Sequence, residues 1–255
     1  MARSQQCLIR GAQRYMENNE CFLITCYQQF EYVCMGINQI KNMESFKDST
    51  IIVVSTSETP MFKILESWFP NVYVIEFSDA PNKDNYISPD IPYKNWRHEF
   101  LALRIFCSMQ LGTTLAWILG ETKLLHLHSD SFWDPSKEQN LIDIFKDLDN
   151  YTVIGDLSAH AESTEIRPKG LCLNPEGLFL NLKRCHECGF VFRFDELFVG
   201  DVFHPDDYGG TEPMLGQSLH WFLTGKILGK DEVPHDIFNK ELKIIMARDY
   251  HGIFP

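Results

Sequence analysis

The sequence predicts an α/β fold, with a mostly parallel central sheet flanked by helices. Short continuous apolar runs, the pattern of fully buried strands, recur along the first half of the chain. Segments with apolar residues at helical spacing follow most of these runs, as the crossovers between parallel strands require. The chain of 255 residues is 44% hydrophobic, which is enough for one large domain with a sizeable core.

The first 155 residues carry most of this signal. Buried strands are predicted at 21–27, 50–57, 72–77, 123–128 and 151–155. Helices are predicted at 31–40, 60–68, 95–119 and 136–148, and Gly112 is a point at which the third of these can divide. A long polar loop with three prolines is predicted at 80–94.

The second half of the chain, from about residue 156 to 255, has a mixed character. Short strands are predicted at 171–173, 177–182 and 191–194, a helix at 211–224, and either strand or helix at 241–246. No repeat or linker separates this part from the first, so we expect two halves of a single domain, 1–255.

The charge and cysteine content limit the classes of partner and compartment. With 23 Lys and Arg against 35 Asp and Glu, the net charge of −12 repels nucleic-acid backbones and anionic membranes. No apolar run reaches the roughly 18 residues that cross a bilayer, so we expect no transmembrane segment. Eight cysteines in a chain of this length do not suggest a disulfide scaffold, and we therefore expect free thiols and a cytoplasmic location.

Polar residues follow the predicted parallel strands where each strand ends. They are Thr25 to Tyr27, Ser55 to Ser57, Ser78 with Asp79, and His128 to Asp130. Ligands of open parallel sheets bind beyond the carboxyl ends of the strands, so we expect these residues to line one crevice.

Two of these strand ends resemble the GT-A fold nucleotide-sugar glycosyltransferases. Phe22-Leu-Ile-Thr-Cys-Tyr27 is similar to the apolar strand that ends at the nucleotide base in that family, and Leu124-Leu-His-Leu-His-Ser-Asp130 to the strand that ends in its Asp-x-Asp motif. The likeness covers nearly the whole chain. It implies a Rossmann-like half at about 20–155 that binds the nucleotide sugar through Thr25, Tyr27 and Ser55, and a smaller acceptor-binding half at about 156–255.

The same likeness implies a divalent metal ion. Carboxylates of the motif hold Mn²⁺ or Mg²⁺, which neutralises the departing nucleoside diphosphate. Asp130 matches the last aspartate of the motif, whereas His128 replaces the first; imidazole is an acceptable ligand for manganese. Tyr250-His251-Gly252 resembles the His-x-Gly stretch of glycogenin-like retaining members, which makes His251 a third candidate ligand. Equally, a histidine and an aspartate at a strand end can form an ordinary solvated loop.

A candidate catalytic base lies in Tyr208-Gly-Gly-Thr-Glu-Pro-Met-Leu215. This stretch resembles the glycine-rich turn and Glu-Asp pair of inverting members, where a carboxylate takes the proton of the acceptor hydroxyl. Glu212 matches the glutamate and Pro213 stands at the aspartate position, so Glu212 is the candidate base, with Asp206 and Asp207 as alternatives. Glu212 can instead stabilise the start of a helix. Because Glu212 favours inversion and His251 favours retention, the stereochemistry stays open, with inversion preferred.

Arg97, His98 and Arg104 lie on or near the helix before the motif, where the resemblance implies that a basic residue can reach the diphosphate. A guanidinium matches phosphate geometry, and Arg104 is the candidate. A structural ion pair is the alternative. Cys185-His-Glu-Cys188 has the spacing of half a zinc site, but the sequence has no second such pair.

The resemblance therefore implies a glycosyltransferase that moves a sugar from a UDP- or GDP-sugar to a hydroxyl of a glycan, protein or lipid-linked acceptor, assisted by Mn²⁺ or Mg²⁺. Two alternatives remain. One is a transferase-like domain that binds its ligand without catalysis, and the other is a metal-dependent hydrolase of sugar nucleotides.

Overall fold

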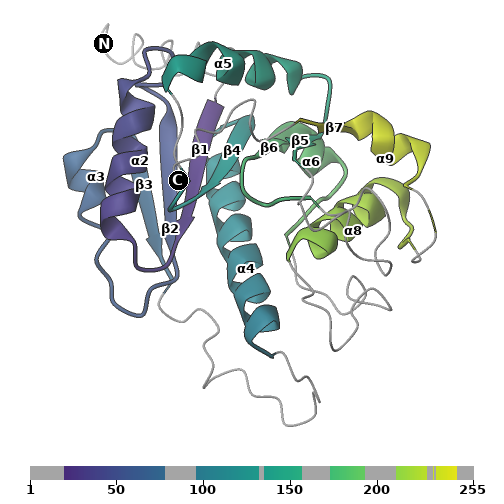
Figure 1. Ribbon diagram of the computed structural model, residues 1–255, viewed down its shortest axis with the longest axis horizontal. Coiled ribbons are helices and arrows are strands. Elements are labelled where there is room, and N and C mark those ends of the chain that lie inside the picture. The colour runs from purple at the N-terminus through teal and green to yellow at the C-terminus, as the bar shows by residue number, and fades with distance from the viewer. Residues whose placement is uncertain are drawn as a thin grey trace, which may run out of the picture.

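A computed structural model describes residues 20–77, 96–131, 135–156, 173–192, 211–228, 232 and 234–245 of the chain. One sheet runs through these ranges, with helices on both of its faces (Figure 1). Its strands are β1 (Glu20–Cys26), β2 (Thr50–Ser55), β3 (Val72–Glu76), β4 (Lys123–His128), β5 (Val153–Gly155), β6 (Leu178–Asn181) and β7 (Leu242–Ile244). The helices are α2 (Phe30–Asn42), α3 (Leu65–Trp68), α4 (Trp96–Ile118), α5 (Glu138–Asp147), α6 (Leu182–Glu187), α8 (Thr211–Thr224) and α9 (Asp236–Glu241), with a 3₁₀ turn η1 (Pro135–Lys137) before α5.

The strands form a seven-stranded sheet in the order β3-β2-β1-β4-β6-β5-β7. The block β3-β2-β1-β4 is parallel. Strand β6 is antiparallel to both of its neighbours, and β5 and β7 are parallel to each other. Of the strands described, six therefore share one direction and β6 alone is reversed. The predicted α/β class, with a mostly parallel sheet flanked by helices, is confirmed.

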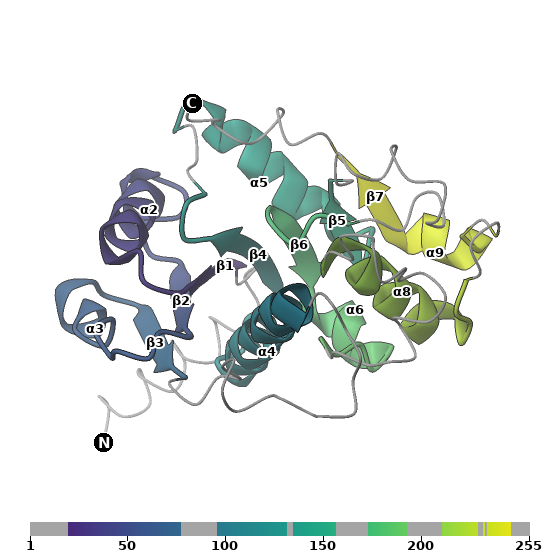
Figure 2. The same cartoon turned by 60° about the horizontal axis from the view of Figure 1, so that its bottom comes forward.

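The alternation of side chains along each buried strand divides the core into two parts. On β1, Phe22 and Ile24 face α2, α3 and α5, whereas Leu23 faces α4. The second face of the sheet is also covered by α6, α8 and α9, whose buried residues join the same cluster as Leu23 (Figure 2). Strands with apolar residues on both faces read as continuous apolar runs, which is why the sequence reveals them.

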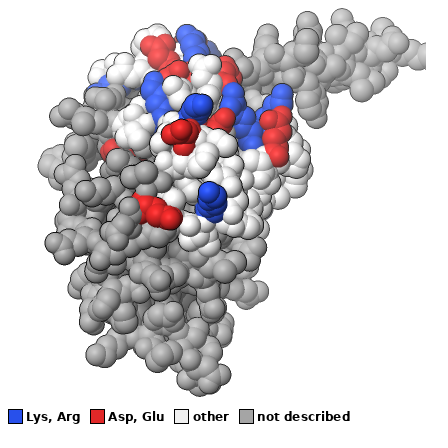
Figure 3. Space-filling model, turned by 90° about the vertical axis from the view of Figure 1, so that its right-hand side faces the viewer, with Lys and Arg blue, Asp and Glu red and all other residues white. Residues whose placement is uncertain are grey.

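On the side of the molecule that lies to the right in Figure 1, the described acidic and basic side chains are interspersed (Figure 3). Among the helices that the structure describes, none combines the length and apolar character of a membrane-spanning segment.

The helix predicted at 60–68 is wrong in its length, because α3 occupies only the last four of those residues. The N–H groups of Met61 and Phe62 both bond to Oε1 of Glu76, at 2.6 and 2.7 Å. The residues that follow form successive turns in which an N–H bonds to the carbonyl three positions before it, as in Leu65 to Phe62 at 2.9 Å. Glu76, at the end of β3, thus accepts from the start of this stretch, and tight turns lead from there into the short α3.

The strand predicted at 191–194 is wrong for its described residues, Val191 and Phe192, which belong to no strand. The N–H of Phe192 donates to Oε1 of Gln110 on α4 at 2.7 Å, and no ladder is needed to satisfy it. The ring of Phe192 is buried beside Phe106, with centroids 6.3 Å apart. Of the described residues of this run, Phe192 therefore reaches the core from a loop, whereas Val191 is exposed.

The remaining predictions for the second half of the chain have different outcomes. Strand 177–182 is confirmed as β6, and the ambiguous tail 241–246 contains β7. Of the run 171–173, Leu173 forms an isolated bridge, and the other two residues lie outside the described part, as does the loop 80–94. The helices α6 and α9 were not predicted.

Helix α4 continues through Gly112, so the predicted division does not occur. A Cβ at Gly112 would lie 2.6 Å from Cδ2 of Leu23 and 3.0 Å from its Cγ. Leu23 is fully buried on β1, which leaves it little room to move. The glycine therefore allows α4 to approach the sheet closely.

We expect Gly112→Ala to lower the free energy of unfolding by about 1–2 kcal/mol, because overpacking outweighs the gain of about 1 kcal/mol in helix propensity. Gly36→Ala in α2 is the matched control, since its added Cβ would meet Ile24 Cδ1 at an ordinary 3.9 Å. That variant should be stabilised by about 0.5–1 kcal/mol. Chemical denaturation measures both, and equal stabilisation of the two variants would contradict the close approach.

Candidate functional site

The candidate site lies at the carboxyl edge of the parallel block. The register pairs Thr25 with His128 across β1 and β4, and Cys26 with Ser55 across β1 and β2. Three predicted site residues, Thr25, Ser55 and His128, thus come from adjacent strands and reach the same edge. The register brings these strand ends side by side, and that they line one crevice stays a prediction. Ser78 and Asp79 lie outside the described residues.

Tyr27 and Arg104 form one part of this edge. The guanidinium carbon of Arg104 lies 4.4 Å from the centroid of the Tyr27 ring, and its Nη2 donates to the carbonyl of Thr56. The ring of Tyr27 is 39% exposed. A cation held over an aromatic face keeps its charge while its orientation is restricted. Arg104 therefore brings a positive charge to the ends of β1 and β2, next to an accessible aromatic ring.

Thr25 and Ser55 have their hydroxyl groups turned into the protein. Both side chains are buried. Oγ of Ser55 accepts the N–H of Ser57 at 3.2 Å, and the Thr25 hydroxyl bonds to His126 at 2.9 Å. Both hydroxyl groups thus stabilise the ends of the strands from inside the protein.

The imidazole of His126 is fully buried on β4, and its two nitrogens have different partners. Nδ1 is 2.6 Å from the carbonyl oxygen of Pro175, and Nε2 is 2.9 Å from Oγ1 of Thr25. A carbonyl can only accept, so Nδ1 carries the proton and Nε2 accepts from the Thr25 hydroxyl. The pKa of His126 is lowered to about 3, mainly because the ring is buried and also because His128 lies near it. His126 is therefore a neutral, structural group that ties β4 to β1 and to the segment before β6.

After β4 the chain makes a tight turn from His128 to Ser131. The N–H of Ser131 donates to the carbonyl of His128 at 3.1 Å, and Oγ of Ser129 donates to Oε1 of Gln29, the residue before α2. The His128 ring is half-buried, with its centroid 5.3 Å from that of His126. Asp130, at the third position of the turn, is exposed. The turn presents an accessible carboxylate beside an imidazole.

Glu176 joins this turn, although the sequence analysis did not single it out. Its Oε1 accepts the hydroxyl proton of Ser131 at 2.6 Å. It lies in Asn174-Pro-Glu-Gly177, a turn-like sequence before β6, and that local signal could have marked a loop. The reversed direction of β6 brings the loop to the end of β4.

The fit of a metal ion rests on few side chains. Within the described ranges, no group of three or more His, Cys, Asp or Glu residues is arranged to hold a metal. His128 and Asp130 are two residues apart in one turn. Mg²⁺-type sites with a bound phosphate typically use one or two protein carboxylates and take their other ligands from phosphate and water. The exposed Asp130 suits a site of that kind. It does not suit a site in which the protein supplies all the ligands.

Several predicted residues have side chains outside the described part. Glu212 is the second residue of α8, and only its backbone is described. His251, Asp206 and Asp207 lie outside the described ranges altogether. The roles assigned to them stay predictions.

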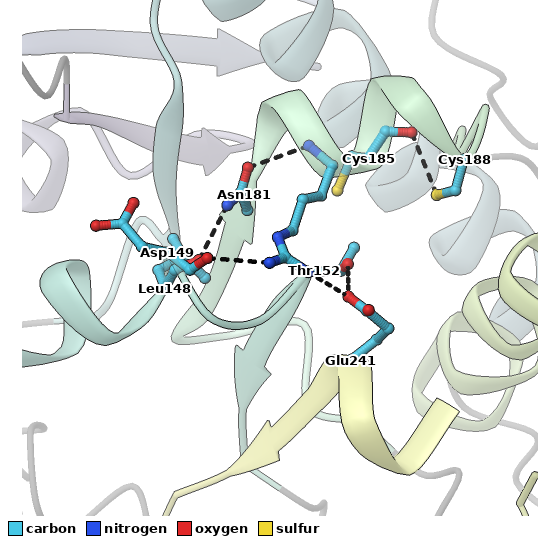
Figure 4. Close-up of polar contacts among 8 residues, drawn as sticks. Leu148, Asp149, Thr152, Asn181, Cys185, Cys188 and Glu241 are labelled. Carbon is cyan, nitrogen blue, oxygen red and sulfur yellow. Dashed lines mark hydrogen bonds and ion pairs between the residues drawn. The ribbon is translucent and has the colours of Figure 1, made fainter. Parts of the chain in front are cut away.

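The pair Cys185 and Cys188 does not behave as half of a zinc site in the part of the chain that the structure describes. Cys188 Sγ donates to the carbonyl of Cys185 at 3.4 Å (Figure 4). Burial raises the pKa of both thiols, which disfavours the thiolate that zinc requires. The two cysteines are a structural part of α6 and its end.

No family model matches the sequence, and no curated protein matches it. Solved structures similar to the chain include TarS 1–349 from S. aureus, with a TM-score of 0.49 and 9% identity, covering 91% of this chain and 59% of that one. The mannosyltransferase PcManGT from Pyrobaculum calidifontis, in complex with GDP-Man and Mn²⁺, has a TM-score of 0.46 and 9% identity, covering 94% and 64%. The galactosyltransferase LgtC, in complex with donor and acceptor sugar analogs, has a TM-score of 0.48 and 13% identity, covering 92% and 87%. This chain spans less than two thirds of the length of TarS 1–349 and PcManGT. At these TM-scores and identities, the likenesses are no evidence for an activity or a ligand of this chain.

We expect His126 to make the protein less stable in mild acid. Its pKa is lowered on folding, from an ordinary value near 6.5 to about 3, so the unfolded state takes up a proton that the folded state does not. The stability that the neutral His126 contributes is present above pH 6.5 and is lost as the pH falls towards 3. Between pH 6.5 and 4.5 the free energy of unfolding should fall by about 2 kcal/mol. Denaturation in the presence of a chelator measures this loss. The variant His126→Asn should be less stable at pH 7 but lack that part of the pH dependence, and parallel curves for the two proteins would contradict the assignment.

Proposed function

We propose that the chain is a GT-A-like glycosyltransferase, which moves a sugar from a nucleotide-diphosphate sugar to an acceptor hydroxyl. One observation carries the proposal. Tyr27 with Arg104, and the turn from His128 to Ser131, lie at the ends of neighbouring parallel strands β1, β2 and β4. An aromatic ring, a cation and an exposed carboxylate at one sheet edge match the base, the diphosphate and the metal of such a donor.

The first half of the chain would bind the donor. Tyr27 offers a partly exposed ring to the base, and Arg104 offers its guanidinium to the diphosphate. Thr25 and Ser55 would act by supporting the strand ends, since their hydroxyls are already bonded within the protein. UDP- and GDP-sugars are the donors to test.

Asp130 would hold Mn²⁺ or Mg²⁺ together with the donor phosphates, with His128 and His251 as the further ligands that the sequence resemblance implies. When bound, the ion would neutralise the charge that builds on the leaving diphosphate. The accessible position of Asp130 supports this role.

Glu212 would serve as the base for an acceptor bound by the second half of the chain. It would take the proton of the acceptor hydroxyl as the oxygen bonds to the sugar C1, while the bond from C1 to the phosphate oxygen breaks and its electrons leave with the diphosphate. The anomeric centre would then invert. The start of α8, where Glu212 lies, supports a carboxylate because the helix dipole is positive there.

The alternative is a transferase-like domain that binds a nucleotide sugar without catalysis. The substitution of His128 for the first aspartate of the motif favours this alternative, because it leaves Asp130 as the turn's single carboxylate. A bound donor that is neither transferred nor hydrolysed would distinguish it from the enzyme, and hydrolysis without an acceptor would indicate the hydrolase.

UDP or GDP should stabilise the protein, and Mn²⁺ should increase the effect. At about 100 times the dissociation constant a ligand adds about 2.7 kcal/mol, or roughly 5 °C in Tm for a chain of this size. Asp130→Asn should remove the metal-dependent part of the shift. Asp236→Asn, which changes an exposed aspartate at the start of α9, should leave it unchanged. Thermal shift assays with UDP, GDP and CMP, each with and without Mn²⁺, test this, and no shift with any of them would sink the proposal.

Arg104→Ala should weaken UDP binding by about tenfold or more, because a hydrogen bond to a charged phosphate contributes about 1.5–3 kcal/mol. Arg184→Ala is the matched control, since its guanidinium also donates to a backbone carbonyl, that of Asp149 at 3.1 Å, but at the opposite edge of the sheet. That variant should lose stability and keep its affinity. Calorimetric titration measures both, and equal losses of affinity would show that Arg104 acts through folding alone.

A further inference from the structure

The carboxylate of Glu176 ends a hydrogen-bonded chain that starts at the main chain of His128. The N–H of His128 donates to Oγ of Ser131 at 3.0 Å, and that hydroxyl donates to Oε1 of Glu176 at 2.6 Å. The direction is determined, because an N–H can only donate and a carboxylate only accept. The single proton of Ser131 must therefore point to Glu176, which makes the carboxylate the acceptor for the whole chain.

Ser131 holds the turn from two sides. Its hydroxyl accepts the N–H of His128, and its own N–H donates to the His128 carbonyl at 3.1 Å. Both main-chain groups of His128 are thus bonded to Ser131, and Asp130 lies between the two residues. The orientation of the exposed carboxylate depends on how firmly Ser131 is held.

Glu176 is itself well anchored. The segment Asn174–Gly177 is bonded to β4 through His126, whose Nδ1 donates to the Pro175 carbonyl and whose own carbonyl accepts the N–H of Gly177 at 3.0 Å. Asn174 adds a bond from its N–H to the carbonyl of Asp156, at the end of β5, at 2.9 Å. Glu176 is therefore attached to the sheet independently of the turn that it supports.

Burial makes this contact stronger than a surface hydrogen bond. Ser131 is 5% exposed, and Glu176 is half-buried. A hydroxyl that donates to a carboxylate away from water forms one of the stronger hydrogen bonds in proteins, and a bond in series polarises its neighbour.

We propose that Glu176 is a positioning residue, whose carboxylate acts through Ser131 to hold the His128–Ser131 turn in the form that binds the donor diphosphate and its metal ion. The ligand in this inference rests on the proposed function. Removal of a group that supports a metal ligand in this way commonly weakens the affinity for the metal by about 10- to 100-fold.

The amino edge of the sheet contains a second pair in which a hydroxyl donates to a carboxylate, and this pair serves as the control. Oγ1 of Thr152 donates to Oε2 of Glu241 at 2.5 Å, and Arg184 donates to the same oxygen at 2.9 Å (Figure 4). Thr152 directly precedes β5, which has the same direction as β4, so this pair lies at the amino edge, away from the turn. A hydroxyl-to-carboxylate bond can thus be removed at either edge.

Calorimetric titration with UDP in the presence of Mn²⁺ tests the functional part. Glu176→Ala and Ser131→Ala should each weaken affinity by about tenfold, and the double variant should lose little more, because both act through one contact. Glu176→Gln keeps an acceptor oxygen and should lose less than Glu176→Ala. Glu241→Ala should lower Tm but keep the wild-type affinity. Equal affinities for Glu176→Ala and the wild type would overturn the proposal, as would an equal loss in Glu241→Ala.

Amide hydrogen exchange of the ligand-free protein tests the positioning part separately. Glu176→Ala should speed exchange about tenfold in peptides that contain residues 128–131, whereas Glu241→Ala should leave those peptides unchanged. Unchanged exchange in Glu176→Ala would overturn the positioning role. If the wild type binds neither UDP nor GDP, the proposed function fails, while the exchange rates still decide whether Glu176 holds the turn.

Discussion

The candidate site depends on the position of β4 between a parallel and an antiparallel neighbour. Pairing with β1 sets Thr25 beside His128, so two strand ends meet at one edge. Pairing with the reversed β6 brings the segment before that strand to the same edge, where the N–H of Gly177 bonds to the carbonyl of His126. In a purely parallel sheet, β6 would present its other end there. Among the strands described, the reversed β6 is what adds a carboxylate, Glu176, to a set of parallel strand ends.

A buried polar group secures this arrangement. Removing an imidazole from water is costly unless its nitrogens are bonded, and His126 satisfies both, one with Pro175 and one with Thr25. These partners come from β1 and from the segment before β6, and they suit only the neutral ring with its proton on Nδ1. A shift of β4 by one residue would bury the imidazole on the other face without these partners, so the group also favours one register.

Polar contacts join elements at both edges of the sheet. At the amino edge, contacts join elements to each other: Lys123, 2% exposed, bonds to the Phe145 carbonyl at 2.7 Å and to Asp149 at 2.9 Å. Arg184 and Glu241 act similarly between α6 and the end of α9. At the carboxyl edge, Tyr27 and Asp130 are left accessible by the contacts beneath them. Contacts that join elements therefore occur at both edges, as those of His126 show for the carboxyl edge, and the accessible Tyr27 and Asp130 lie at the carboxyl edge.

The sequence by itself determined the order of strands and helices in the first half, because a buried strand and an amphipathic helix each have a local apolar period. It also determined that Thr25, Ser55 and His128 meet at one edge, since parallel strands align their carboxyl ends. The tertiary structure alone decided that Glu76 accepts the N–H groups of Met61 and Phe62 before a short α3, that Phe192 reaches the core from a loop, and that Glu176 bonds to Ser131 in the turn after β4. Each of these rests on a contact with a distant partner, and Glu176 lies 45 positions from Ser131. A local pattern holds no information about such pairings, which follow from the reversed direction of β6 and from the packing of the completed sheet.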